Sequence, residues 1–245
     1  MEDKALLSTE VASGAEKAEL LIVIPAYNEA ENIERVVNHL TANFPQYDYV
    51  VVNDGSRDET AAICQRNGYN LLNLPVNLGL AGAFQAGLKY ADKYGYQYAV
   101  QLDGDGQHRP EYLESMIKKM EEGYDIVIGS RFVGEKKPFT MRMLGSNLIE
   151  MAIRFTTGVN IKDPTSGMRM FSKRMIREFA SGLNYGPEPD TVSYLIRQGA
   201  RVAEGPVIMD ERILGVSYLT PVNAMRYMLK MLISILLIQN FRKRR

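Results

Sequence analysis

Asp103 and Asp105 are separated by a single glycine and directly follow the apolar segment 98–102, and Gln107 comes two residues later. Two carboxylates and an amide oxygen within one tight turn are hard oxygen ligands, which suit Mg²⁺ or Mn²⁺ shared with the phosphates of a ligand. Aspartate and glycine are also ordinary turn residues, so the Asp-x-Asp pattern alone says little. Its position after a buried strand is what favours a metal site.

A second group of residues that could bind a ligand or take part in catalysis is basic. Segment 131–177 holds ten lysines and arginines against three acidic residues, a balance that favours an anionic ligand. Arg142 and Ser146 are four residues apart, so they share one helix face, where a guanidinium and a hydroxyl could grip the same phosphate. Arg131 is expected at a strand end. The alternatives are a solvated basic helix face or ion pairs with Glu135 and Glu150.

The elements that must position these residues follow from hydrophobic patterning. Continuous apolar runs, typical of strands buried on both faces, occur at 20–24, 50–53, 69–74, 98–102 and 126–128. Segments of helical periodicity lie between and after them, at 30–42, 58–67, 80–93, 110–122 and 141–157. This alternation predicts an α/β fold with a mostly parallel sheet and helices on both faces.

Polar residues follow each predicted strand, at 25–29, 53–56, 77–79, 103–108 and 129–131. In parallel sheets the carboxyl ends of the strands line the crevice in which ligands bind. We therefore expect these five polar segments to converge on one site.

Several protein classes are disfavoured by what the sequence lacks. The first strand is not followed by the G-x-G-x-x-G of dinucleotide-binding folds, and the Walker phosphate loop and G-x-S-x-G are absent. The 29 basic and 29 acidic residues cancel, which argues against a general nucleic-acid partner. One cysteine, Cys64, favours a reducing, cytosolic setting. Residues 1–19 are acidic and polar, and we expect a disordered leader without a targeting signal.

The tail is nearly all apolar over residues 227–238 and ends in the basic run 242–245. A spanning helix requires about 20 apolar residues, so this run is too short. An apolar, amphipathic C-terminal helix with a cationic end suits a helix that lies on an anionic membrane surface. The alternatives are a core helix, an oligomer interface or a docking site for a small membrane-protein partner.

Six motifs carry a family resemblance, namely PAYNE, VNDGS, NLGLAGA, DGDGQH, GSR and DPTSGMRMF. In this order and at these spacings the chain resembles a family 2 inverting glycosyltransferase of the GT-A fold, over about residues 20–219. Its DGDGQH motif, the Arg131 segment, Arg142 with Ser146 and the segment 211–217 are most similar to the dolichyl-phosphate mannose synthase branch and its bacterial undecaprenyl-phosphate relatives. The resemblance covers a catalytic domain at 20–219. With the composition of the two ends, the expected organisation is a leader at 1–19, this domain and a C-terminal helix at 220–245.

The resemblance also implies roles for individual residues. The nucleotide would be held by residues after the first four strands, namely Pro25, Tyr27, Glu29, Asp54, Asn77, Gly79 and Asp103. The metal, Mg²⁺ or Mn²⁺, would be held by Asp103, Asp105 and Gln107. The acceptor phosphate would be held by Arg131, Arg142 and Ser146, while Arg212 would reach the diphosphate or the acceptor. One departure is that the R-x-x-G-x-S-K motif of the mannose synthases ends here as Ser217-Tyr218.

The expected reaction is metal-dependent transfer of a sugar from a nucleotide-sugar donor to a polyprenyl phosphate such as undecaprenyl phosphate, for cell-envelope glycan assembly. The resemblance suggests N-acetylglucosamine or glucose carried on UDP, and a location on the inner face of the cell membrane. A phosphate acceptor is already anionic and needs no strong general base.

Two alternatives remain open from the sequence. One is a glycosyltransferase that acts on a hydroxyl of a growing polysaccharide, for which Glu188 is the first candidate base and Asp163 the second. The other is a catalytically silent nucleotide-sugar-binding subunit, which the intact Asp103, Asp105 and Gln107 disfavour. A turn explains the segment around Glu188 equally well.

Overall fold

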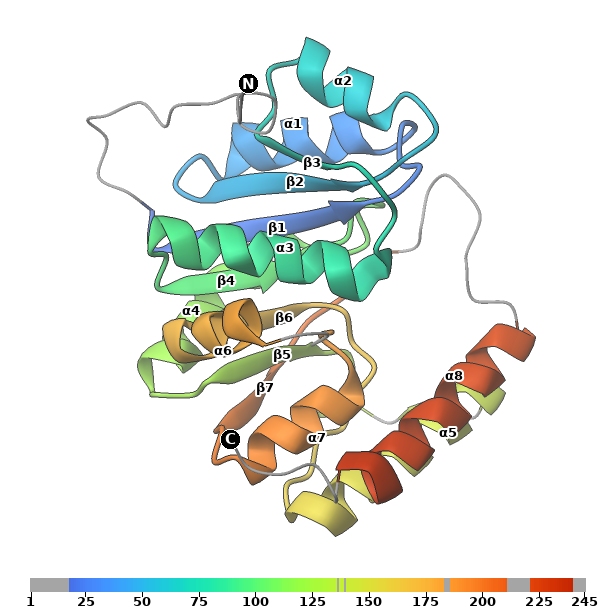
Figure 1. Cartoon of the computed structure of the whole chain (residues 1–245). Helices are drawn as coiled ribbons and strands as arrows, with labels where there is room; N and C mark the ends of the chain where they lie inside the picture. The colour runs from blue at the N-terminus through green and yellow to red at the C-terminus, as the bar shows by residue number, and fades with distance from the viewer. Residues whose placement is uncertain (1–17, 136, 139, 183–185, 211–220, 240–245) are drawn as a thin grey trace. The chain divides into compact units, whose positions relative to one another are not determined.

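A computed structural model of the chain describes residues 18–135, 137–138, 140–182, 186–210 and 221–239. The chain divides into two compact units. The first comprises 1–111, 170–186 and 209–215, and the second comprises 112–169, 187–208 and 216–245. Figure 1 shows the helices and strands of both units, which are described in turn.

The strands of the first unit are β1 (Leu20–Ala26), β2 (Asp48–Asp54), β3 (Leu71–Leu74), β4 (Tyr98–Gln101) and β6 (Arg169–Ser172). They lie in the order β3-β2-β1-β4-β6. The pairings of β1 with β2 and β4, and of β2 with β3, are parallel, whereas β4 and β6 run antiparallel. Every residue of β1 is buried, as its unbroken apolar sequence predicts.

The helices of the first unit are α1 (Ile33–Asn43), α2 (Thr60–Arg66), α3 (Gly79–Tyr94) and α6 (Lys173–Ser181). Helix α3 packs on β1 and β2 and against α6, and α3 and α6 lie in front of the strands in Figure 1. Three aromatic rings join these layers, since Phe84 of α3 lies 5.5 Å from Phe171 and Phe171 lies 5.1 Å from Phe179 between ring centroids. All three are buried, so this aromatic cluster fixes α3 and α6 in the core.

The second unit contains α4 (Leu113–Glu121), β5 (Ile126–Ser130), α5 (Met141–Thr157), α7 (Pro189–Arg197) and β7 (Val202–Pro206), and ends with α8 (Pro221–Ile233) and the π-helical segment η2 (Ser234–Ile238). A short 3₁₀ turn, η1 (Pro110–Tyr112), precedes α4. Strands β5 and β7 are parallel. Helix α5 begins where the Thr140 hydroxyl accepts a hydrogen bond from the Met143 amide at 3.2 Å, and it ends at Gly158 in the left-handed conformation.

The predicted α/β class with a mostly parallel arrangement is confirmed, as are the first five strands and the helices between and after them. The sequence analysis did not predict four elements, namely β6, α6, α7 and β7. The tail is helical as expected, and its helix begins at Pro221, within the predicted range 220–245. None of the described helices is long and apolar enough to cross a membrane. The predicted leader lies almost wholly outside the described residues.

Candidate active site

The loop after β1 carries the PAYNE motif and is bonded to the loop after β2. Asn28 adopts a left-handed conformation with φ 55°. Its backbone N–H donates to the Ser56 hydroxyl at 3.0 Å, and its side-chain oxygen accepts from the Arg57 amide at 2.9 Å. The Glu29 amide donates to the Thr60 hydroxyl at 2.9 Å. The two strand-end loops therefore form one polar rim, from which Tyr27 emerges half-buried.

Asp54 ends β2 and organises the segment after β3. Its carboxylate Oδ1 accepts from the Leu78 amide at 2.7 Å, and its carbonyl accepts from the Asn77 side chain at 3.1 Å. Gly55 follows with φ 63°, and a Cβ there would lie 2.7 Å from the backbone of Val76 and Asn77. No L side chain fits so close an approach at positive φ. The structure thus brings together Asp54, Asn77 and Gly79, as the sequence predicted.

The turn after β4 holds Asp103 and Asp105. The Asp103 side chain is 33% exposed, whereas Asp105 is 8% exposed. Asp103 Oδ1 accepts from the Gln101 amide nitrogen at 2.9 Å, and Asp105 Oδ1 accepts from the Gln107 backbone N–H at 3.0 Å. These bonds orient both carboxylates, and the partly exposed Asp103 can be reached by a ligand.

His108 is buried beneath this turn. Its Nδ1 accepts from the Asp103 backbone N–H at 3.0 Å, which assigns the proton of the neutral ring to Nε2. Nε2 lies 3.6 Å from Asp103 Oδ2. On the other side, the Arg35 guanidinium donates to the Asp105 carbonyl at 2.9 Å. It passes so close to Gly106, at φ 81°, that a Cβ there would lie 2.8 Å from Arg35 Nη2. The turn is therefore held rigidly from two sides.

Segment 209–210 is bonded to the same turn, although it is about one hundred residues away in sequence. Gln107 donates its side-chain N–H to the Asp210 carbonyl at 3.2 Å, and the Asp210 amide donates to the Gln107 carbonyl at 2.9 Å. Arg109 Nε contacts both Asp210 carboxylate oxygens at 2.9 Å, and its hydrogen bonds lower the pKa of Asp210. The sequence analysis missed this pair. Arg212, two residues beyond, lies outside the described residues.

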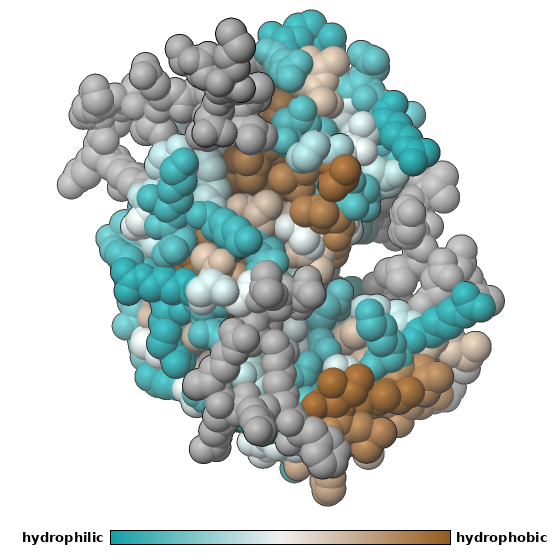
Figure 2. All heavy atoms as spheres, viewed as in Figure 1, coloured by the Kyte–Doolittle hydropathy of each residue, from teal (hydrophilic) through white to brown (hydrophobic). Residues whose placement is uncertain are grey.

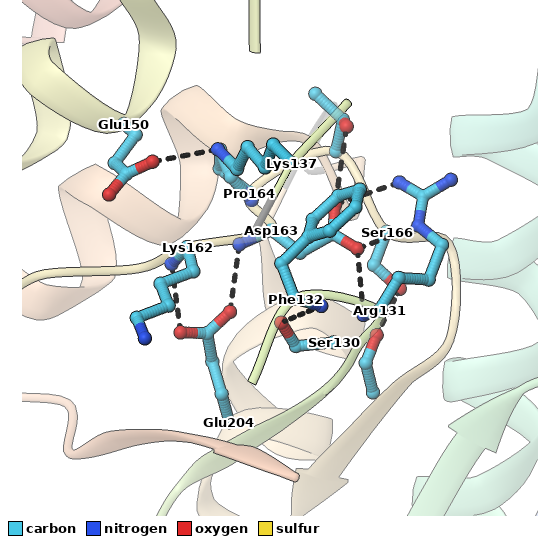
Figure 3. A network of polar contacts seen from close by, with 12 residues as sticks. Ser130, Arg131, Phe132, Lys137, Glu150, Lys162, Asp163, Pro164, Ser166 and Glu204 are labelled. Carbon is cyan, nitrogen blue, oxygen red and sulfur yellow. Dashed lines mark hydrogen bonds and ion pairs between the residues drawn. The ribbon is translucent and has the colours of Figure 1, made fainter. Parts of the chain in front are cut away.

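In the second unit, Arg131 at the end of β5 pairs with Asp163 rather than with Glu135 or Glu150. Its Nε and Nη2 donate to the two carboxylate oxygens at 2.7 and 2.8 Å, and its backbone N–H donates to Oδ2 at 3.1 Å (Figure 3). The Asp163 side chain is fully buried. The bidentate pair fixes the guanidinium plane and leaves its Nη1 edge for a second anion.

Asp163 lies among further polar bonds, made by residues of β7 and of the loop that follows Asp163. Its backbone N–H donates to Glu204 at 2.8 Å, and the adjacent Ser166 hydroxyl donates to the Gly129 carbonyl at 2.5 Å (Figure 3). Both carboxylate oxygens of Asp163 are engaged by the Arg131 guanidinium. The geometry therefore favours a positioning role for Asp163, and its use as a base stays a prediction.

Glu150, one of the expected partners of the arginines, instead binds Lys137 at 2.7 Å. Ser146 is fully buried in α5, and its hydroxyl has no hydrogen-bond partner among the described residues. A buried hydroxyl without a partner is costly unless something else bonds it. Because the side chain is fully buried, no ligand reaches it in this conformation, and its contact with the acceptor stays a prediction. The side chain of Arg142, its predicted companion, lies outside what the structure describes.

Arg169 and Glu188 belong to a buried polar cluster at the start of α7. The guanidinium of Arg169 donates to the Pro164 carbonyl at 2.6 Å and also to the Pro187 carbonyl. Burial lowers the pKa of Arg169, although nearby carboxylates, Glu188 among them, oppose this. The Tyr227 hydroxyl of α8 donates to the Glu188 carboxylate. Burial and the charge of Glu188 raise the pKa of Tyr227, which keeps it protonated.

A second carboxylate, Asp190, binds the end of the tail. The Ser234 hydroxyl donates to it at 2.5 Å, and Gln239 donates to it at 3.3 Å. The tail is thus fastened by polar bonds to the segment that carries Glu188. The sequence analysis treated that segment as a turn and did not foresee these bonds.

The predicted site residues therefore fall into two groups. The first unit assembles the nucleotide and metal candidates, namely Pro25, Tyr27, Glu29, Asp54, Asn77, Gly79, Asp103, Asp105 and Gln107. The second unit holds the described acceptor and base candidates, namely Arg131, Ser146, Asp163 and Glu188.

This arrangement of strand-end loops with an Asp-x-Asp turn is that of a nucleotide-sugar transferase of the GT-A fold. The chain belongs to glycosyl transferase family 2, whose family model matches residues 21–180.

Two relatives cover most of the chain. A polyprenol monophosphomannose synthase from Mycolicibacterium smegmatis is 31% identical over 86% of this chain and 84% of its own length. An undecaprenyl-phosphate mannosyltransferase from Micrococcus luteus is 31% identical over 81% of this chain and 86% of its own length. Among solved structures, glucosyl-3-phosphoglycerate synthase from Mycobacterium tuberculosis, in a complex with Mn²⁺ and UDP, is similar with a TM-score of 0.66 at 20% identity, covering 90% of this chain and 79% of that one. This last likeness shows the fold.

Proposed function

We propose that the chain transfers a sugar from a nucleoside diphosphate sugar to a polyprenyl phosphate, with inversion at the anomeric carbon. The observation that carries the donor half is the Asp103–Asp105 turn, oriented by Gln101, His108 and the Arg35 contact within the same unit as Asp54. The two relatives, whose names specify a polyprenol or undecaprenyl-phosphate acceptor, support the acceptor half.

The donor would lie across the strand ends of the first unit. Asp54 uses Oδ1 to hold the Leu78 amide, so Oδ2 is the oxygen available to a base or a ribose hydroxyl. Tyr27 and the bonded rim around Asn28 would border the nucleotide. Asn77 and Gly79 follow on the next strand end, where Asn77 accepts from the Gly79 amide at 3.1 Å. The bonds from Asp54 to the Asn77–Leu78 segment fix these two loops, which is how a preorganised site lowers the cost of binding.

The residues present fit a divalent cation. Asp103 and Asp105 supply carboxylate oxygens, and Gln107 supplies its amide oxygen, since its amide nitrogen is used on Asp210. The described residues hold no group of three or more His, Cys, Asp or Glu side chains that could bind a metal together. Bound Mg²⁺ or Mn²⁺ would neutralise charge that develops on the leaving diphosphate. Solved structures of the similar synthase contain Mn²⁺ with UDP, which supports this part of the proposal.

In the reaction, an oxygen of the acceptor phosphate attacks the anomeric carbon and forms the new C–O bond. The bond from that carbon to the diphosphate breaks, and the nucleoside diphosphate leaves with the electron pair. No proton has to be removed from a phosphate that is already ionised, so no general base is required. The Nη1 edge of Arg131, oriented by Asp163, would hold the acceptor anion, with Ser146 and Arg142 as further predicted contacts.

Glu188 has a lesser claim to act as a base in this scheme. Its carboxylate is already engaged as the acceptor of the Tyr227 hydroxyl. The bond is better suited to holding α8 in place. The role of Glu188 in the hydroxyl-acceptor alternative stays a prediction.

The identity of the transferred sugar is the most specific part of the proposal. Both relatives are named for mannose, which favours mannose as the donor sugar. N-acetylglucosamine or glucose on UDP, expected from the sequence, stays a prediction, and so do a homo-oligomer, a small membrane-protein partner and a place on the inner face of the cell membrane for cell-envelope assembly.

The test is transfer of label into lipid. The full chain would be incubated with radiolabelled GDP-mannose, UDP-glucose or UDP-N-acetylglucosamine, with undecaprenyl phosphate in detergent and Mn²⁺, and then extracted with organic solvent. We expect label in the organic phase for one donor. It should be lost with a chelator and in Asp105→Asn, and kept in the surface control Glu114→Gln. Label that stays aqueous with every donor would reject the proposal.

A further inference from the structure

Exposed hydrophobic side chains gather on three helical elements of the second unit. Ten of the fourteen large hydrophobic side chains that are exposed in the described chain lie on α5, α8 and η2. They are Leu144, Leu148, Met151, Phe155, Met225, Leu229, Ile233, Leu236, Leu237 and Ile238. Figure 2 shows a hydrophobic surface over α8. We call these ten residues the α5–α8 surface. So large a group rarely faces water without a function.

The spacing shows that each helix contributes one face. On α5 the exposed residues recur at intervals of four, three and four residues, which is one stripe of an α-helix. Phe155, at the end of that stripe, is 85% exposed. On α8, Met225, Leu229 and Ile233 recur every four residues, and η2 continues the apolar run. Helices α5 and α8 pack on one another and lie side by side in Figure 1.

The inner sides of these helices already pack against other residues of the unit. The exposed stripes are therefore a second apolar face, separate from the side that packs into the core. Met231 and Ile235 are buried. Gly145 of α5 is opposed so closely by the Met228 side chain that a Cβ at Gly145 would lie 2.8 Å from it. The polar groups of the tail also point inward, as the bond from Ser234 to Asp190 shows. A helix that is apolar on both its inner and outer sides requires an apolar medium outside.

The charges beside the stripes are cationic. Arg154 of α5 and Arg226 and Lys230 of α8 are exposed. The sequence of α8 and η2 contains no acidic residue, and the one acid of α5, Glu150, is paired with Lys137. Apolar side chains bordered by cations complement an anionic lipid leaflet, where hydrocarbon lies beneath charged headgroups.

We propose that the α5–α8 surface binds an anionic membrane leaflet and that α5 carries as much of this contact as the tail. The sequence pointed only to the C-terminal helix. The inference rests on the proposed function in one respect only, namely that the membrane would supply the lipid-linked acceptor. Binding to lipid itself requires neither donor nor acceptor.

Vesicle flotation of the full chain tests the surface. We expect binding to vesicles of phosphatidylcholine with phosphatidylglycerol, weaker binding to phosphatidylcholine alone, and release by high salt. Phe155→Ser should weaken binding by about tenfold, because a large apolar side chain no longer leaves water. Arg226→Gln and Lys230→Gln should each weaken it by about fivefold. Val76→Ser, which changes an apolar residue of the first unit that is 57% exposed, should leave binding unchanged.

Two results would overturn the inference. One is unchanged vesicle binding in Phe155→Ser, which would leave the tail as the sole contact. The other is a wild type that does not bind vesicles and sediments as a dimer in analytical ultracentrifugation, while Phe155→Ser sediments as a monomer. A second copy of the chain would then cover the surface. Circular dichroism would confirm that the variant is folded.

Failure of the proposed function has a different signature. If Phe155→Ser transfers sugar normally to acceptor in detergent but poorly to acceptor in vesicles, both proposals hold. If the wild type binds vesicles yet transfers no sugar under either condition, the membrane surface stands and the reaction is rejected.

Discussion

Arg131 receives its orientation from Asp163, and this makes the kind of cation at position 131 matter as much as its charge. A lysine would keep the charge and so would not leave Asp163 buried without a partner. It cannot, however, bond two carboxylate oxygens and still present a nitrogen to a second anion. The geometry of the guanidinium can therefore be tested separately from the fold.

We expect Arg131→Lys to lower kcat/KM for polyprenyl phosphate by about tenfold or more, while the KM for the nucleotide sugar changes little. Steady-state kinetics with each substrate varied in turn would measure this. Lys162→Met, which removes an exposed cation next to Asp163 in the sequence, is the matched control and should behave as wild type. A similar loss for both substrates in Arg131→Lys would contradict the assignment.

Cys64 gives a prediction about pH. Its thiol is buried, and burial raises its pKa from an ordinary 9.0 to about 11. The fraction present as thiolate is therefore about one hundredfold lower than in the unfolded chain at the same mildly alkaline pH. A thiol reagent at pH 8 should leave the native protein unmodified and react rapidly once urea is added.

The sign of the stability effect follows from the same shift. A folded-state pKa above the unfolded value favours the neutral thiol in the folded state, so this contribution is complete below pH 9 and is lost as the pH rises toward 11. Urea unfolding across this range should show a steeper decline for the wild type than for Cys64→Ala. Parallel declines would show that the thiol is not shielded.

At the scale of elements, the bond between Tyr227 and Glu188 fastens α8 to the start of α7. We expect Tyr227→Phe to destabilise the protein by about 1 kcal/mol, because a half-buried carboxylate loses its donor. Equilibrium urea unfolding would measure it. Tyr69→Phe removes an exposed hydroxyl that donates to Asn38 at 2.7 Å, and it should cost much less. Equal costs would mean that the Glu188 bond does not hold the helix.

The sequence predicts the elements that have a strong local signal. Strand β1 is a run of apolar residues and was placed correctly, whereas β7 reads VAEGP and offers neither an apolar run nor alternation. Strand β6 has four residues and begins with Arg169. Arginine is rarely buried, so the sequence alone does not indicate a buried strand here. Its guanidinium is buried by carbonyl groups that the fold brings from Pro164 and Pro187.

The same reasoning explains what was found and missed in the site. Asp54, Asp103 and Asp105 follow apolar strands, so their position was predictable from the order of the chain. The partnerships of Arg109 with Asp210 and of Tyr227 with Glu188 join residues far apart in sequence. Such pairs depend on tertiary structure, and no local pattern in a single sequence indicates them.

At the scale of the whole molecule, a ligand that binds only the folded state must raise its stability. A nucleoside diphosphate with Mn²⁺ at about one hundred times its Kd would contribute about 2.7 kcal/mol, which corresponds to about 5–10 °C in the unfolding midpoint. We expect this shift with UDP or GDP plus Mn²⁺, a smaller shift with either component alone, and none in Asp105→Asn. Differential scanning fluorimetry would measure it and would also identify the preferred nucleotide.

The chain contains two histidines, His39 on an exposed helix face and His108 beneath the Asp103 turn. Because the ring of His108 is locked by the backbone of that turn, it can serve as a spectroscopic reporter. In a nitrogen-15 imidazole spectrum with few resonances, paramagnetic Mn²⁺ that arrives at Asp103 should broaden the signals of the His108 ring, whose Nε2 lies 3.6 Å from Asp103 Oδ2. The occupancy of the turn could then be followed during titration without any turnover of sugar.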